Sequence, residues 1–86
     1  PNATTALTNR AVAHTELGDY EAALQDCNLA ININPNDPLA YNNRGYIYEK
    51  MQRIQEAVGD YQSACDLGIE LSCKEVKRLS EIAPDL

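Results

Sequence analysis

Basic residues are scarce in this chain. Lysine and arginine together number 7 against 13 aspartate and glutamate residues, so the net charge is −6 at neutral pH. Three of the seven, Lys74, Lys77 and Arg78, gather near the C-terminus. Binding to a phosphate backbone or to an anionic membrane needs clustered lysine and arginine. The sequence also lacks an apolar run long enough to span a bilayer. We therefore expect no nucleic-acid partner and no membrane association.

Cysteine and histidine are few as well. The three cysteines are an odd number without C-x-x-C spacing, which indicates neither a disulfide framework nor a zinc site. Cys27 and Cys65 fall on apolar helical faces, so we expect them to be small core residues. A bridge between Cys65 and Cys73 is the alternative in an oxidising compartment. His14, the only histidine, has no metal-ligating residue at suitable spacing, and we interpret it as a packed residue of a helix face.

The chain also lacks the marks of an enzyme. It has no nucleophile–base pair, no glycine-rich phosphate loop and no metal cluster, so we expect no catalytic residue, no metal and no cofactor. It begins with Pro1-Asn2, without an initiating methionine or a signal peptide, and we interpret it as a piece of a longer protein. The lack of a disulfide pattern favours the cytoplasm, although the sequence does not fix the compartment.

What the chain does contain is an internal repeat of 34 residues. Asn9-Arg10 returns as Asn43-Arg44. Four further identities fall at the same offset: Ala6/Ala40, Ala23/Ala57, Asp26/Asp60 and Ala30/Ala64. A period of this length is typical of a helix-turn-helix unit that stacks on its neighbours into a solenoid.

Apolar spacing and turn signals predict four helices, over residues 4–17, 21–33, 38–51 and 55–67. Gly18-Asp19 ends the first helix, and Pro35 and Pro38 separate the second from the third. The residues expected to face inward from the first helix are Leu7, Ala11, His14 and Leu17.

A fifth helix is predicted over residues 72–83. Ser72 with Glu75 three residues later matches a capping box. A narrow apolar stripe follows, formed by Cys73, Val76, Leu79 and Ile82. Because this segment lacks the small-residue pattern of the two repeats, we interpret it as a helix that caps the open end of the stack.

These residues resemble the tetratricopeptide repeat. The stretch Leu17-Gly-Asp-Tyr-Glu-Ala-Ala-Leu is specific to that pattern, and the second unit departs from it at Gln52, Ile54 and Ile69. The resemblance implies an all-α fold, an alpha-alpha superhelix of two antiparallel helix pairs and a capping helix. Its units are repeat 1 over 4–37, repeat 2 over 38–71 and the cap over 72–83.

The resemblance further implies that the first helix of each pair lines a concave groove, where members of the family bind a peptide or a partner protein as scaffolds, co-chaperones or assembly factors. The expected groove residues are Thr5, Asn9, Val12, Leu39, Asn42, Asn43, Tyr46 and Lys50, with Thr8 and Glu16 beside them. Asn9 and Asn43 could pair with a peptide backbone or with neighbouring groups of the chain. Some relatives grip an acidic tail with cations, but the matching places, Thr8, Val12, Leu39 and Asn43, hold none.

Arginine and aspartate recur together in both units. Arg10 lies sixteen residues before Asp26, and Arg44 sixteen residues before Asp60. We expect two structural ion pairs, Arg10–Asp26 and Arg44–Asp60, that fix the register of the paired helices. Ligand binding by these arginines is the alternative.

The sequence therefore predicts an interaction module with a peptide or protein partner. Two alternatives remain, namely self-association through the uncapped N-terminal helix pair into a homo-oligomer, and a structural spacer unit of a longer array.

Overall fold

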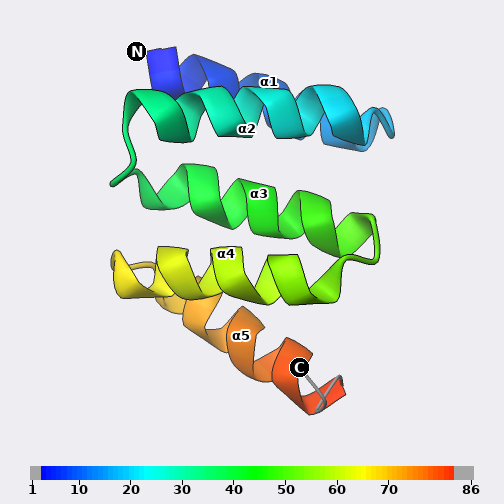
Figure 1. Cartoon of the computed structure of the whole chain (residues 1–86), viewed down its shortest axis with the longest axis vertical. Coiled ribbons are helices and arrows are strands. Elements are labelled where there is room, and N and C mark those ends of the chain that lie inside the picture. Colours follow the sequence, from blue (N-terminus) through cyan, green and yellow to red (C-terminus); the bar gives the residue numbers. More distant parts are fainter. Residues whose placement is uncertain (1–2, 83–86) are drawn as a thin grey trace.

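The computed structural model describes residues 3–82, which form five α-helices and contain no strand. The helices are α1 (Ala3–Glu16), α2 (Tyr20–Ile33), α3 (Pro38–Lys50), α4 (Ile54–Asp66) and α5 (Glu70–Ile82). Figure 1 shows the first four stacked as two antiparallel pairs, α1 with α2 and α3 with α4, while α5 runs obliquely beside α4. This arrangement confirms the predicted all-α class. The helix ends differ from the predicted ones by one or two residues.

Acidic side chains begin two of the helices. Asp19 accepts a hydrogen bond from the backbone N–H of Ala22 at 3.2 Å, and Asp37 accepts one from that of Leu39 at 3.0 Å. Each bond satisfies an N–H that the helix itself leaves unpaired. These caps explain why α2 and α3 begin where they do.

The turns after α1, α3 and α4 each use one residue with positive φ. Gly18 has φ +80° and Gly68 has φ +113°. The same turn position in the second repeat is occupied by Gln52, with φ 63°. A side chain disfavours this left-handed conformation, whereas glycine adopts it readily. The turn geometry is therefore kept in the second repeat without its glycine.

Small residues bring the helices of each pair close together. Four alanines at repeating positions, Ala23, Ala30, Ala57 and Ala64, are fully buried. At Gly45 a Cβ atom would lie 3.1 Å from the ring of Tyr61, so a side chain there would displace the ring. Close packing of this kind fixes the distance between α3 and α4.

The inward face of α1 differs from the predicted one. Leu17 follows the end of the helix and is 81% exposed, so the prediction that it faces inward is wrong. The buried face consists instead of Ala11 and three threonines, Thr4, Thr8 and Thr15. The Thr15 hydroxyl donates to the Ala11 carbonyl at 2.7 Å. Because the helix backbone itself accepts the hydroxyl proton, threonine can be buried here.

The predicted start of the fifth helix is also wrong. α5 begins at Glu70, so Ser72 lies inside the helix and does not cap it. Ser72 is fully buried, and its hydroxyl donates to Oδ1 of Asn42 in α3 at 2.9 Å. At the other end of the predicted apolar stripe, Leu79 is fully buried but Ile82 is 68% exposed, because α5 diverges from the stack.

A disulfide joins α4 to α5. Cys65 and Cys73 are bonded, with their Cα atoms 4.8 Å apart, so the structure contains the alternative pairing rather than the expected core role of Cys65. Cys27 is fully buried, as expected, and burial raises the pKa of its thiol to about 12. The bridge closes the turn at Gly68 and holds the first part of α5 against α4.

Candidate functional site

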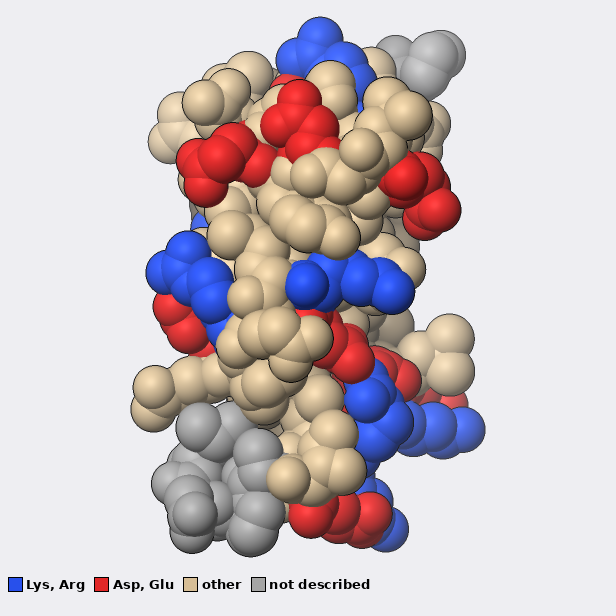
Figure 2. Space-filling view, turned by 90° about the vertical axis from the view of Figure 1, so that its right-hand side faces the viewer, with Lys and Arg blue, Asp and Glu red and all other residues tan. Residues whose placement is uncertain are grey.

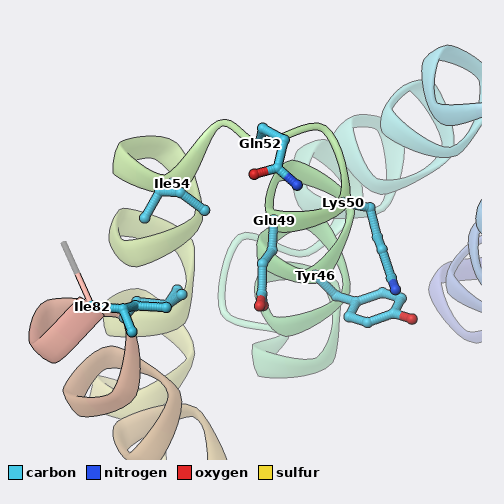
Figure 3. Close-up of a pocket in the computed structure, with 7 residues that line it drawn as sticks. Tyr46, Glu49, Lys50, Gln52, Ile54 and Ile82 are labelled. Atoms are coloured by element: carbon cyan, nitrogen blue, oxygen red, sulfur yellow. The ribbon is translucent and has the colours of Figure 1, made fainter.

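Two adjoining cavities open between α3 and α5. The larger has a volume of about 390 Å³ and is lined by Asn42, Asn43, Tyr46, Glu49, Tyr61, Leu71, Glu75 and Arg78. The smaller has a volume of about 290 Å³ and is lined by Tyr46, Glu49, Lys50, Gln52, Ile54, Leu79 and Ile82. Figure 3 shows the smaller cavity, with Ile54 and Ile82 on one side and Tyr46 with Glu49 on the other. Tyr46 and Glu49 line both cavities, so we treat them together as the α3–α5 groove.

Most charged groups of the α3–α5 groove neutralise one another. Glu49 accepts hydrogen bonds from the Tyr61 hydroxyl at 3.0 Å and from Nη2 of Arg78 at 2.7 Å. Arg78 also pairs with Glu75. Burial raises the pKa of Tyr61, and the nearby Glu49 carboxylate adds to that shift. The hydrogen bonds to Glu75 and Glu49 raise the pKa of Arg78. The Tyr61 hydroxyl therefore stays protonated, and Glu49 is held in place by two donors.

Lys50 is the remaining cation at the rim. Its ammonium lies 5.3 Å from the centre of the Tyr46 ring, as Figure 3 shows. Both side chains are exposed. A cation over a tyrosine face restrains the ring only weakly at an exposed site. Tyr46 therefore presents an aromatic surface to the groove that a ligand could displace or cover.

The structure gathers only part of the predicted binding set around these cavities. Four of the eight residues line them: Asn42, Asn43, Tyr46 and Lys50. The other four, Thr5, Asn9, Val12 and Leu39, are exposed but line neither cavity. The neighbouring Thr8 is buried, with its hydroxyl bonded to the Thr5 carbonyl at 3.1 Å, so it is not a groove residue.

The asparagines differ in what they contact. The Oδ1 atom of Asn42 is occupied by the Ser72 hydroxyl. Asn9 and Asn43, by contrast, make no side-chain hydrogen bond to one another or to other groups within residues 3–82. Their amides can still donate to and accept from a ligand.

The residues that α5 contributes to the groove were missed in the sequence. Leu71, Glu75 and Arg78 were assigned to a cap with a polar outer face. One signal could have found them, since Arg78 lies 34 residues after Arg44 and so continues the repeat. No helix follows α5 within the described residues to offer an aspartate. Arg78 reaches Glu49 of α3 instead, and this contact places it in the groove.

The two arginine–aspartate pairs lie where the recurrence placed them. Nε and Nη2 of Arg10 donate to Asp26 at 2.9 and 2.7 Å, and the same atoms of Arg44 donate to Asp60 at 2.8 and 2.8 Å. Nη1 of Arg44 also donates to Asn28 of α2 at 2.9 Å. The hydrogen bond from Arg10 lowers the pKa of the Asp26 carboxyl. Both arginines are therefore engaged within the fold, each bridging the two helices of its pair.

Charge is mixed elsewhere on the surface. Figure 2 shows acidic and basic side chains interspersed over one face, without a continuous patch of either sign. Within residues 3–82, no group of three or more histidine, cysteine, aspartate or glutamate side chains is placed to hold a metal ion. None of the five helices is long and apolar enough to cross a membrane.

Known families and structures match this chain over most of its length. Residues 11–52 match a model described as TPR repeat, and residues 39–67 match one described as tetratricopeptide repeat. The chain is 38% identical over 60 residues to human RNA polymerase II-associated protein 3, and 31% identical over 80 residues to human sperm-associated antigen 1. These matches cover 70% and 91% of the chain but 9% of each relative.

Solved structures are similar to the whole fold. The first TPR of Spaghetti (RPAP3) bound to the HSP90 peptide SRMEEVD superposes with a TM-score of 0.85 at 30% identity. That match covers 94% of this chain and 66% of the other. The first TPR domain of human RPAP3 gives a TM-score of 0.83 at 31% identity, over 92% of this chain and 64% of the other. The chain thus spans about two thirds of these solved domains and a small part of the full-length relatives.

Proposed function

The chain belongs to the tetratricopeptide repeat family, and we propose that it is a protein–protein interaction module that binds a peptide or partner-protein segment in the α3–α5 groove. The concave side of α1 extends this surface through Thr5, Asn9 and Val12. In a longer protein such a module acts as a scaffold or adaptor, bringing the captured segment to the rest of the molecule.

The observation that carries this proposal is the composition of the groove. It combines an exposed aromatic ring on Tyr46, an uncommitted amide on Asn43 and apolar walls at Ile54, Leu71 and Ile82. An amide can pair with the backbone of an extended segment, while the ring and the apolar walls pack against its side chains. A related domain, that of RPAP3, was solved with an HSP90 peptide bound, which supports a peptide ligand here.

The chemistry of the groove favours a ligand without a strongly acidic end. The places at which some relatives carry cations hold Val12, Leu39 and Asn43, and Thr8 is buried. Arg78 is already paired with Glu49 and Glu75. Lys50 alone therefore faces an incoming carboxylate from the rim, so apolar and amide contacts supply most of the recognition.

A comparison of two variants by affinity capture tests the proposal. The groove variant carries Asn9→Ala, Asn43→Ala and Tyr46→Ala, and the control carries Gln25→Ala on the exposed face of α2. We expect a protein captured by the wild type and by the control to be lost with the groove variant, while circular dichroism shows all three folded. Capture that survives in the groove variant would move the binding site to another face.

A further inference from the structure

The two repeats differ in what covers the first helix of each pair. On α3, Ala40 and Ile47 are 0% and 1% exposed, because α1 and α2 pack over them. The equivalent positions on α1 hold Ala6 and Ala13, which are both exposed. We define the open edge of α1 as the six positions equivalent to this covered face of α3: Ala6, Leu7, Arg10, Ala13, His14 and Leu17. The open edge thus continues the established α2–α3 interface of the stack but has no helix against it within residues 3–82.

The arginines show what is missing at the open edge. Arg44 uses two nitrogens for Asp60 and the third, Nη1, for Asn28 of the preceding helix. Arg10 makes the same two bonds to Asp26, but its Nη1 has no hydrogen-bond partner among residues 3–82. The Arg44 side chain is 23% exposed and the Arg10 side chain 62% exposed. A donor held in fixed geometry by its other two bonds is prepared to receive an acceptor at little further cost in side-chain entropy.

The face that α2 presents to α3 shows which surface fits such an edge. Leu24 and Cys27 pack in one core cluster with Ile47 of α3, and Asn28 accepts from Arg44. The pattern is therefore an apolar residue at position i, a small apolar residue at i+3 and an acceptor at i+4, all on one side of a helix.

We propose that the open edge of α1 binds an amphipathic α-helix of a partner protein that carries this pattern, with an amide or carboxylate oxygen aimed at Nη1 of Arg10. Alanines at positions 6 and 13 allow a helix to approach closely. A second copy of this domain fits less well. Its α2 pattern is covered by α3, and the equivalent apolar residues on α4, Val58 and Tyr61, are covered by Leu79 and Val76 of α5. This surface is separate from the α3–α5 groove.

The test uses a peptide that imitates the α2 face. It carries the sequence of residues 20–33 with Cys27→Ala, and a chemical link on its exposed side holds it helical, because a free segment this short is only partly helical in water. The peptide is titrated into the isotope-labelled domain, and amide shifts are followed by NMR. Two variants at neighbouring positions of α1 separate the faces: Ala13→Glu on the open edge, and Val12→Glu on the concave side.

The proposal expects shifts at Ala6, Arg10 and Ala13, and binding weakened about tenfold or more by Ala13→Glu, since the added side chain prevents close approach. Val12→Glu should leave peptide binding unchanged, and the peptide variant Asn28→Ala should bind more weakly. Shifts confined to other faces, binding indifferent to Ala13→Glu, or no binding would each overturn the proposal. A dimer in sedimentation that Ala13→Glu dissociates would do so too, because the occupant would then be a second copy. Loss of groove binding in Val12→Glu alone concerns only the proposed function.

Discussion

Removing the Arg44 side chain is the sharpest test of how the two repeats are held together. Arg44 joins three helices, since it bonds Asp60 of α4 through two nitrogens and Asn28 of α2 through a third. The side chain of Asp60 is only 9% exposed. Arg44→Ala therefore leaves a nearly buried carboxylate without its cation.

The expected cost follows from that burial. Breaking a fully buried ion pair on one side costs about 3–5 kcal/mol. Because Arg44 itself remains 23% exposed, water screens part of the interaction, and we expect a loss of about 2–3 kcal/mol in the free energy of unfolding. For a domain of this size, that corresponds to a fall in Tm of roughly 10–20 °C.

Thermal unfolding followed by circular dichroism measures this effect. The matched control is Lys50→Ala on the same helix, which removes a cation whose main contact is the exposed Tyr46 ring at 5.3 Å and should cost about 0.5 kcal/mol or less. Arg10→Ala should fall between the two, since the Arg10 side chain is 62% exposed. Equal and small decreases in Tm for Arg44→Ala and Lys50→Ala would refute the assignment of Arg44 as a structural staple.

Three further predictions concern the turn, the disulfide and the pH dependence. Gln52→Gly should raise the free energy of unfolding by about 1 kcal/mol, because Gln52 has φ 63°, whereas Gln55→Gly inside α4 should lower it by a similar amount; chemical denaturation would show both. Cys73→Ser should cost about 2–3 kcal/mol, given a separation of 8 residues between the bonded cysteines, and a reductant should lower the Tm of the wild type but not of this variant. Stability should fall as the pH drops below about 4 through the lowered pKa of Asp26, because a depressed folded-state pKa favours folding only while the carboxyl is ionised. Arg10→Ala should weaken this dependence in melts recorded across the acid range, and an unchanged acid profile would contradict the role of the pair.

How much of the binding site could be predicted depended on where each residue lies. The α3 residues Asn42, Asn43, Tyr46 and Lys50 were assigned to the groove from the repeat register alone, and they line its cavities. The α1 residues with the same register do not, since the cavities form against α5 rather than against α1. The wall contributed by α5 was missed because its charged residues also match an ordinary solvent-facing cap.

The sequence by itself determined the features that depend on local spacing. The recurrence over 34 residues set the number of helices and their order, and small residues at fixed offsets set the close packing of each pair. The pairing of Arg10 with Asp26, and of Arg44 with Asp60, could also be expected, because both partners recur at one separation in each unit.

Only the tertiary structure decided how α5 lies across the stack. Its position depends on contacts between residues far apart in the chain: Ser72 with Asn42, Arg78 with Glu49, and Leu79 in the core beside Tyr61. Each of these side chains fits an exposed or a buried position equally well by local pattern, and the periodicity of a single helix cannot choose between them. The groove exists because those distant contacts tilt α5 away from the direction of the other helices, and its chemistry follows from that tilt.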